Sequence, residues 1–475
     1  MSWKPSGLST LWRPRPQLDP AKMAVSFGTL AHDPKTKVYL QHRDAVLVEG
    51  PTGSGKTWRI AYQLVNSAPG FVLATTTKSR DVLGATIAHR AEVGSVAVFD
   101  PENLTGWPDS MRWSILAGCE DPDTAIRRAA ALARAMPMEG AKNSGYFEAK
   151  ASTLLRCYLH AAALERVSIR KVRQWVSSRT TTTAREILAR SLPDWAAELE
   201  QILDSSSESS DDVIAAAARL LEPLASPKLL QAVDVPQDES FDVASFVLDP
   251  HGRSNTLYLV SKGGSGSGSM APFVAALAAE AHYIADRASQ KNPSGRLDPP
   301  ARFVLDEVNN VAPIPDLPAI FSDSGGRGIN VWAFAHNQRQ NQQRWGDHGG
   351  LMLAYSAPAM VILPGMRGDE LSEISRLIGD RKEWRATVGR GTTSYQQHND
   401  TVMNNAQIRE MDTDHALLLY RNSRPVLVHL PTVWQNPVLK RRVLASLAEF
   451  DEIVSTGVVP EKYRNPMTAR RKKLL

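Results

Sequence analysis

The sequence predicts an α/β fold in which a mostly parallel sheet is interrupted by an all-helical domain. Short apolar runs of strand length alternate with helical segments up to about residue 120 and again from residue 256. This pattern is typical of a parallel sheet with helices on both faces. Between these regions strand signals are nearly absent. Because strands return after the helical block, we expect the block to be an insertion in one α/β domain.

The first α/β region contains three predicted strands. Val46–Glu49 is a short apolar strand followed by glycine, and residues 60–65 continue as a helix. Residues 71–74 and Val96–Phe99 are further apolar runs of strand length, bounded by Pro, Gly and Asp. Strands and helical segments therefore alternate, as parallel strands require.

From about residue 121 to residue 238 the sequence predicts helices only. Residues 124–136 are rich in Ala and Arg with helical spacing, and residues 147–164 form a second long helix. Residues 205–212 are a polar loop whose last residues can cap the next helix. The remaining predicted helices cover 167–175, 184–192, 195–203 and 213–221.

Strand signals return in the last part of the chain. The predicted strands are Thr256–Val260, 302–305, 331–335, 360–363, 416–420 and 426–430, with helices at 271–286 and 438–454. A glycine and serine run at 263–269 lies between a strand and a helix. We interpret it as a mobile loop, with an engineered segment as the alternative.

The composition excludes several classes of protein. Of 475 residues, 43% are hydrophobic and 22% are charged, which excludes disordered, collagen-like and coiled-coil chains. The two cysteines, Cys119 and Cys157, are too few for a disulfide scaffold or a zinc ribbon and indicate a reducing compartment. Residues 1–22 lack the apolar core of a signal peptide, and the sequence contains no apolar stretch of a length that predicts a membrane span.

The formal net charge of +5 is concentrated at the ends of the chain. The last sixteen residues carry six Lys or Arg against one Glu, and the first 22 residues have an excess of three positive charges. The body between them is therefore slightly acidic, and its composition alone does not indicate a nucleic-acid binder. The basic ends either contact phosphate, acidic protein or anionic lipid, or are solvated tails.

A phosphate-binding loop follows the first predicted strand. The motif consists of Gly50, Pro51, Thr52, Gly53, Ser54, Gly55, Lys56 and Thr57. Its glycines let backbone N–H groups surround a phosphate, and the following helix directs its positive end at the anion. Lys56 would reach the β and γ phosphates, and the Thr57 hydroxyl would bind Mg²⁺. The strand and helix on either side are the context that this motif requires.

Two adjacent carboxylates follow the predicted strand 302–305. Asp306 would hold Mg²⁺ through water, and Glu307 would orient and deprotonate the attacking water. This second acid separates a hydrolysing motor from a kinase, and the sequence has no Asn-Lys-x-Asp selector for guanine. The two motifs together predict a P-loop NTPase that binds ATP and Mg²⁺ and hydrolyses ATP.

The segment after these carboxylates has a specific pattern. Residues 306–318 read Asp-Glu-Val-Asn-Asn-Val-Ala-Pro-Ile-Pro-Asp-Leu-Pro, and a glycine/arginine turn, a strand and a glutamine-bearing motif follow at 324–340. Further matching stretches lie at 99–116, 144–150 and 360–379. Together these motifs resemble the TraG/TraD-like coupling proteins of type IV secretion, the ATPases of conjugative DNA transfer. The resemblance extends in order over about residues 25–435.

The resemblance implies a RecA-like motor domain with an inserted helical domain, working as a homo-hexameric ring, with a monomer as the alternative state of the isolated chain. Its implied partners are single-stranded DNA, a relaxase or relaxosome, and components of the type IV secretion channel. Its implied task is to deliver relaxase-bound DNA, or effector proteins, to that channel. Coupling proteins usually begin with membrane-spanning helices, whereas this sequence predicts none. We therefore expect a cytoplasmic chain recruited to the inner or plasma membrane by a partner or by its basic tail.

The resemblance also suggests further site residues. His336 stands where the family's glutamine sensor is usual, and Gln340 matches its second glutamine, so Gln340 or His336 is the candidate sensor of the γ-phosphate. Arg327 is the candidate arginine finger for a neighbouring subunit's site, with Arg367 and Arg421 as alternatives. The family's Asp-Pro-Lys-Gly-Glu motif is replaced by Thr-Thr-Thr-Lys at 75–78, so the role of its acid is absent or moved.

These interpretations give five predicted regions and leave two alternative functions. The regions are a basic extension 1–22, a nucleotide-binding domain in two parts (23–120 and 239–458), a helical insertion 121–238, and a basic tail 459–475. One alternative is a hexameric DNA translocase of the FtsK/HerA kind, which lacks the Ile-Pro-Asp-Leu stretch. The other is an assembly scaffold that binds nucleotide without motor activity, against which the intact Lys56 and Glu307 argue.

Overall fold

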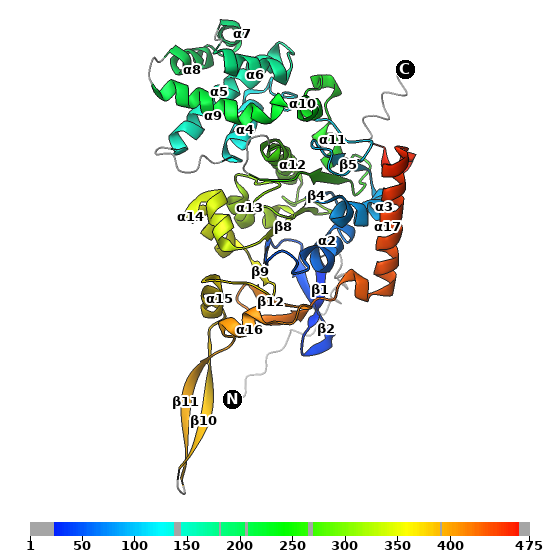
Figure 1. Ribbon diagram of the computed structural model, residues 1–475, viewed down its shortest axis with the longest axis vertical. Coiled ribbons are helices and arrows are strands. Elements are labelled where there is room, and N and C mark those ends of the chain that lie inside the picture. The colour runs from blue at the N-terminus through cyan, green and yellow to red at the C-terminus, as the bar shows by residue number, and fades with distance from the viewer. Residues whose placement is uncertain are drawn as a thin grey trace, which may run out of the picture.

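The computed structural model describes residues 23–136, 144–179, 182–204, 208–264, 269–389 and 392–464, and an 11-stranded sheet runs through its middle (Figure 1). The strand order is β2-β1-β13-β12-β9-β3-β8-β7-β4-β6-β5. The strands are β1 (Ala24–Leu30), β2 (Asp33–Gln41), β3 (Val46–Glu49), β4 (Val72–Thr76), β5 (Val96–Phe99), β6 (Thr256–Val260), β7 (Ala301–Leu305), β8 (Ile329–Ala335), β9 (Ala359–Ile362), β12 (His415–Tyr420) and β13 (Val426–His429).

The strands from β9 to β5 are all parallel and form the centre of the sheet. In this part β3, β4, β5, β6, β7 and β8 are buried along their whole length. Strands covered on both faces need apolar side chains at consecutive positions. That requirement explains why every one of these strands was predicted from an apolar run.

The other edge of the sheet is antiparallel and was predicted only in part. Strands β9, β12, β13, β1 and β2 pair antiparallel in that order. The β1–β2 hairpin was not predicted, because β2 is largely exposed and its sequence, Asp-Pro-Lys-Thr-Lys-Val-Tyr-Leu-Gln, has little apolar content. An edge strand with solvated side chains lacks the apolar run from which a strand is predicted.

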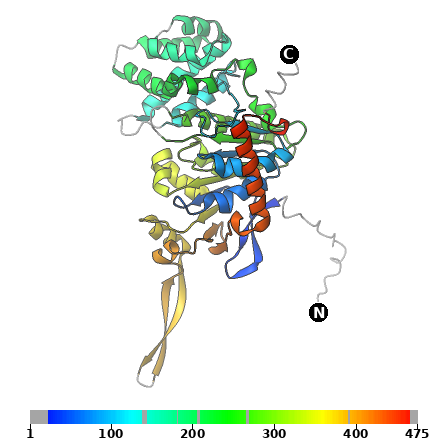
Figure 2. The same cartoon turned by 45° about the vertical axis from the view of Figure 1, so that its right-hand side comes forward.

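Helices cover both faces of the parallel part. On one face lie α2 (Tyr62–Asn66), α3 (Gly84–Val93) and α17 (Pro437–Thr456), and Figure 2 shows α17 running across the outside of this layer. On the other face lie α12 (Ala271–Lys291), α13 (Leu317–Asp323) and α14 (Gln338–Ser356). Each face has its own buried apolar cluster, which is the layered architecture expected of an α/β protein.

A block of helices caps one end of the molecule (Figure 1). It contains α4 (Pro122–Arg134), α5 (Ser144–Leu164), α6 (Ile169–Ser178), α7 (Thr182–Ser191), α8 (Pro193–Asp204), α9 (Glu208–Leu221) and α10 (Pro227–Val233). Helix α4 packs on α12 of the sheet layer, where Arg128 pairs with Glu280. The buried side chains of the block are continuous with those beneath the sheet, so the limits 121 and 238 stay a prediction.

A two-stranded ribbon projects from the opposite end (Figure 1). Strands β10 (Asp380–Gly389) and β11 (Thr392–Thr401) pair only with each other, from Asp380 opposite Thr401 to Gly389 opposite Thr392. The short helices α15 (Glu370–Ile378) and α16 (Asn405–Arg409) lie at its base. No strand was predicted here, because the segment is largely polar and has no continuous apolar run.

The C-terminal boundary differs from the prediction. Residues 459–464 were assigned to a basic tail, yet Tyr463 is only 1% exposed and its ring meets Trp107 edge-on at 5.9 Å. Trp107 also stacks on Phe450 of α17 at 5.7 Å. Residues 465–475, the extension 1–22 and the centre of the 263–269 run lie outside the described residues.

Helices α5 and α12 are each 21 residues long. Within the described ranges, however, no helix combines the length and the apolar character needed to cross a bilayer.

Candidate functional site

The candidate site lies where four neighbouring parallel strands end. In the sheet, β3, β8, β7 and β4 are adjacent in this order. Their carboxyl ends lie on one edge, where ligands of open α/β sheets bind. The segments that leave this edge are the phosphate loop after β3, His336 after β8, Asp306 and Glu307 after β7, and Lys78 after β4. The strand order thus brings together residues from three distant parts of the chain.

The phosphate loop adopts a conformation that depends on glycine. Gly53 and Gly55 have φ of +84° and +88°, in the left-handed region that disfavours other residues. Ser54 Oγ donates to the Pro51 carbonyl at 2.8 Å, which closes the turn. A helical segment then begins at Thr57 and runs to Asn66, so its amino end points into the loop, as anion binding requires.

Lys56 is buried within the loop, with 8% of its surface exposed. Its Nζ donates to the Gly50 carbonyl and lies 3.2 Å from Nδ1 of His336. In the part of the chain that the structure describes, no carboxylate lies within ion-pair distance of this ammonium group. Burial lowers the Lys56 pKa, and the charges of Asp306 and Glu307 oppose that shift. A buried ammonium group without an anionic partner fits a site for phosphate.

Asp306 and Glu307 face the loop from the end of β7. The pKa of Asp306 rises to about 6, mainly because of burial; the charge of Lys56 opposes this rise, and that of Glu307 contributes to it. Thr75 Oγ1 of β4 donates to the Asp306 carbonyl at 2.7 Å, which fixes the end of β7 beside β4. Oxygen ligands are the donors that Mg²⁺ prefers, so the carboxylate of Asp306 and the hydroxyl of Thr57 fit this ion.

The backbone of Glu307 is strained. Its φ is +47°, a conformation that costs a non-glycine residue about 1–3 kcal/mol. The Glu307 N–H donates to Oδ1 of Asp306 at 3.1 Å, so the sharp turn links the two carboxylates. Strain of this kind is typically retained at functional sites.

His336 and Gln340 lie on the chain that leaves β8. Burial, and then the charge of Lys56, lower the His336 pKa, so the ring is neutral at pH 7 and Nδ1 accepts from the ammonium group. Gln340 lies in the first turn of α14, and its N–H donates to the capping side chain of Asn337 at 2.9 Å. Gln340 Oε1 is buried without a hydrogen-bond partner among the described residues.

The three candidate arginines lie in different places. Arg327 precedes β8, a seven-residue strand, and is therefore roughly 20 Å from the phosphate loop at the opposite edge of the sheet. It pairs with Asp286 at 2.6 Å and with Asp323. Arg421 is also on the far edge, bound to the buried Asp44. Arg367 is exposed on the loop edge, two residues after Gly365, which approaches Pro51.

A third acid at the site was not predicted from the sequence. Asp81 lies just after β4 in the short helical segment Ser79–Leu83 and pairs with Lys78 at 3.7 Å. Burial raises its pKa, Glu307 adds to the rise, and the Asp81 charge in turn raises the pKa of Asp306. The three carboxylates therefore interact electrostatically. The signal for Asp81 would have been an acid one helical turn after Lys78.

Comparisons with known proteins identify similar sequences and folds. Residues 300–413 match a family model described as the TraM recognition site of TraD and TraG. The unbound structure of the bacterial conjugative coupling protein TrwBdeltaN70 matches with a TM-score of 0.65 and 18% identity, over 87% of this chain and 89% of that chain. The resemblance to TraG/TraD-like coupling proteins is confirmed.

Two further matches are structures of the plasmid coupling protein TrwB. One is in complex with ADP and Mg²⁺, and the other with a non-hydrolysable ATP analogue. Each has a TM-score of 0.60 and 18% identity, and covers 82% of this chain and 86% of that chain. The predicted RecA-like P-loop NTPase fold is therefore confirmed. No protein with curated annotation matches this sequence.

The segment that matches the family model covers part of the candidate site. It begins with β7 and extends past α16, so it includes Asp306, Glu307, Arg327 and His336 as well as the β10–β11 ribbon. The phosphate loop precedes the matched segment in sequence. It is nevertheless adjacent to that segment in the sheet, because β3 pairs directly with β8.

Proposed function

We propose that this chain is an ATP-hydrolysing coupling protein that delivers relaxase-bound single-stranded DNA, or effector proteins, to a type IV secretion channel. The observation that carries the proposal is the convergence of the phosphate loop with Asp306 and Glu307 at one edge of the sheet. Coupling-protein folds with this pair of motifs suit nucleotide hydrolysis coupled to movement of a substrate.

Each residue at the site has a distinct role in the proposed reaction. The loop glycines direct backbone N–H groups at the phosphates, and Lys56 exchanges the Gly50 carbonyl for the β and γ oxygens of ATP. Thr57 and Asp306 hold Mg²⁺, which neutralises charge on the phosphates. Glu307 orients the attacking water and accepts its proton. His336 keeps Lys56 in place, and His336 or Gln340 senses the γ-phosphate.

We further propose that the active form is a homo-hexameric ring in which Arg327 serves a neighbouring site. Arg327 is about one strand length from the site of its own subunit, so it can act only on another subunit. Its side chain is 28% exposed, so it is accessible at the surface. Arg367 is the alternative, because it lies on the same edge as the phosphate loop.

The proposed partners follow from the family. The matched family model is described by its recognition of TraM, which supports contact with a relaxosome component through residues 300–413. Single-stranded DNA would be held through its backbone by loops that face the pore of the ring. The basic residues near the chain ends, or a membrane-bound partner, would hold the chain at the cytoplasmic face of the inner or plasma membrane.

The decisive experiment combines hydrolysis and transfer. Glu307→Gln should retain ATP binding and lose hydrolysis by a factor of about 10²–10⁴, and the same variant should abolish DNA transfer in a mating assay. An exposed-residue variant, Asp347→Asn, serves as the matched control. If the wild type hydrolyses ATP but Glu307→Gln still supports normal DNA transfer, the result would favour a general DNA translocase. Absence of hydrolysis in the wild type, even with single-stranded DNA, would favour a nucleotide-dependent scaffold.

A further inference from the structure

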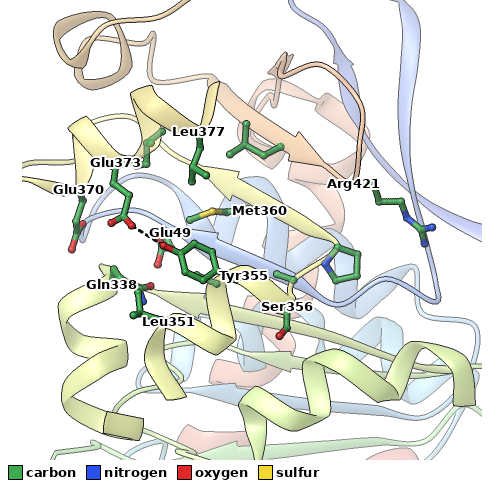
Figure 3. Close-up of a pocket in the computed structure, with 15 residues that line it drawn as sticks. Glu49, Gln338, Leu351, Tyr355, Ser356, Met360, Glu370, Glu373, Leu377 and Arg421 are labelled. Carbon is green, nitrogen blue, oxygen red and sulfur yellow. Dashed lines mark hydrogen bonds between the residues drawn. The ribbon is translucent and has the colours of Figure 1, made fainter. Parts of the chain in front are cut away.

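A second cavity lies beside the nucleotide site, between α14, α15 and the strands β9 and β12. Its volume is about 390 Å³, within the range of small-molecule sites. Figure 3 shows Glu49, Glu370 and Glu373 gathered on one side of it, with Met360 and Leu377 on the adjacent wall. Of the described residues that line it, none belongs to the predicted nucleotide-binding set. The cavity is therefore a separate site.

Glu49, the most buried acid of this cavity, has no ion-pair partner among the described residues, whereas Arg376 lies 4.0 Å from Glu373 and the charge of Arg339 acts on Glu370. Glu49 is 2% exposed, and its Oε1 accepts from Asn341 Nδ2 at 3.1 Å. The Glu49 pKa rises to about 8, mainly because of burial, with contributions from the charges of Glu370 and Glu373. The lining includes one cationic residue, Arg421, but its guanidinium is already paired with Asp44. Three carboxylates thus face a space in which a positive charge would be stabilised.

Among the described residues, two polar atoms on the same side lack hydrogen-bond partners. Gln338 is 91% buried and lines the cavity, and its Nε2 is one of these atoms. Glu370 Oε2 is also buried without one. Buried polar atoms in folded proteins are almost always paired, and leaving them unpaired is unfavourable. Both residues line the cavity, so a bound molecule that offers a donor and an acceptor would satisfy both atoms once the two side chains turn towards it.

The rest of the wall is apolar and reaches the surface. Ala354 of α14, Met360 of β9 and Ile374 of α15 line it, and Leu377 is 50% exposed at its margin. Tyr355, which is 61% exposed, donates to Glu373 Oε1 at 2.9 Å. An amphipathic molecule can therefore enter with its polar end towards Glu49 and its apolar end towards Met360.

We propose that this cavity binds a small organic cation with an apolar tail, a protonated aliphatic amine with a neighbouring hydroxyl being the simplest case. The ammonium group would lie among Glu49, Glu370 and Glu373, and the hydroxyl oxygen would accept from Gln338 Nε2. The tail would pack on Met360 and Leu377. This inference goes beyond the proposed function, and its test does not depend on ATP hydrolysis.

The position of the cavity connects its ligand with the nucleotide site. Glu49 is the last residue of β3 and directly precedes Gly50 of the phosphate loop. Gln338 is two residues after His336, whose ring contacts Lys56. Glu49 and Gln338 are thus each within two residues of a residue of the nucleotide site.

Isothermal titration calorimetry on the full chain without nucleotide tests the proposal. The cationic probe is 1-amino-2-hexanol, and 1,2-hexanediol is its neutral analogue. We expect saturable one-to-one binding of the amine, at least about tenfold tighter than that of the diol. Glu49→Gln should weaken amine binding by at least about tenfold, whereas Glu452→Gln, an exposed acid on α17, should leave it unchanged. Equal binding of amine and diol would overturn the proposal.

Two further measurements guard against a variant that fails to fold. Ala354→Trp fills the cavity from α14 and should abolish binding of both probes, with an unchanged circular dichroism spectrum. Amine affinity should rise between pH 6.5 and pH 8.5, because Glu49 must lose its proton to pair with the ammonium group. The nearby titratable and charged groups are Glu370, Glu373, Arg339, Arg376 and Arg421. Affinity independent of pH, or undiminished in Ala354→Trp, would contradict the site.

Discussion

Lys56 Nζ lies 3.2 Å from His336 Nδ1 across 280 positions of sequence. The contact exists because β3 and β8 are neighbours in the sheet and both end at the nucleotide edge. It joins the residue that should bind the β and γ phosphates to one that leaves the adjacent strand. A change at the phosphates can thus reach the amino end of α14 through one hydrogen bond.

The first prediction concerns His336 as an acceptor for Lys56. His336→Ala should lower kcat by about tenfold to a hundredfold, since a hydrogen bond to a charged group is lost, while His336→Gln retains an acceptor and should recover most of the rate. Steady-state ATP hydrolysis measures both. Equal rates for the Ala and Gln variants would show that the hydrogen bond is irrelevant to turnover.

The same contact predicts a pH dependence with a definite sign. Burial and Lys56 hold the His336 pKa below its ordinary value of 6.5, so the unfolded chain takes up this proton before the folded chain does. The contribution of His336 to stability is therefore complete above pH 6.5 and decreases as the pH falls below that value. The free energy of unfolding of wild type and His336→Gln should consequently converge in acid. A constant difference from pH 5 to pH 8 would contradict this assignment.

The second prediction concerns Asp306 as a source of instability. Its pKa rises to about 6 from an ordinary value of 3.8, so the folded state favours the neutral carboxyl and its ionised form destabilises the nucleotide-free chain above pH 6. Asp306→Asn should therefore raise the free energy of unfolding at pH 7 by about 3 kcal/mol, while it abolishes Mg²⁺-dependent hydrolysis. Thermal and denaturant unfolding measure the first effect, with Asp347→Asn as the control.

The difference between wild type and Asp306→Asn should also depend on pH. It should shrink as the pH falls below 6 and close below 3.8, because the wild-type carboxyl is then protonated in both states. A full-size difference that persists at pH 3 would assign the stabilisation to something other than the charge of Asp306.

The third prediction concerns Asp81, the acid that the sequence analysis did not find. If its carboxylate helps hold Mg²⁺ through water, Asp81→Asn should raise the Mg²⁺ concentration for half-maximal hydrolysis by about three- to tenfold, with a smaller change in the rate at saturating Mg²⁺. Lys78→Ala, which removes the ion-pair partner of Asp81, should not raise this Mg²⁺ requirement. An equal fall in rate at all Mg²⁺ concentrations would indicate a structural role instead.

The fourth prediction separates two parts of the C-terminus. Removal of residues 465–475 should leave the thermal midpoint unchanged and should affect membrane or partner binding, because it deletes basic residues that follow the packed segment. Further removal of residues 461–464 also deletes Tyr463, whose ring packs on Trp107, and should cost about 3 kcal/mol. Equal thermal midpoints for the two truncations would show that Tyr463 contributes nothing.

The sequence predicted the parallel part of the fold better than its edges. A strand such as Val96–Phe99 is buried on both faces, and its apolar run is visible without any knowledge of its neighbours. The β10–β11 ribbon is polar, and its strands pair only with each other, so its formation depends on a pairing that single-strand patterns do not contain. The β1–β2 hairpin was missed for the same reason.

The site was predictable where a motif carries the chemistry. The phosphate loop and Asp306 follow from residue type and spacing, because glycine, lysine and carboxylate are what phosphate and Mg²⁺ require. The contact of His336 with Lys56 depends on strand order, and that of Asp81 with Asp306 and Glu307 depends on the bend after β4. Neither relationship is encoded in a local pattern. No sequence pattern predicted the cavity around Glu49.

The last prediction concerns Arg327, which is held by Asp286 and Asp323 at the far edge of the sheet. If it completes a neighbour's active site, Arg327→Ala should reduce turnover by about 10³-fold or more and leave the dissociation constant for ATP within about threefold. Arg327→Lys keeps a positive charge without the planar fork and should restore little activity. Asp323→Asn is the matched control, because it removes one ion pair without removing the arginine.

The measurement is specific activity as a function of protein concentration, since a residue supplied by a neighbour acts only in the assembled ring. If Arg327→Ala lowered the unfolding temperature while its remaining activity stayed normal, Arg327 would be a structural ion-pair residue, and Arg367 would become the candidate finger.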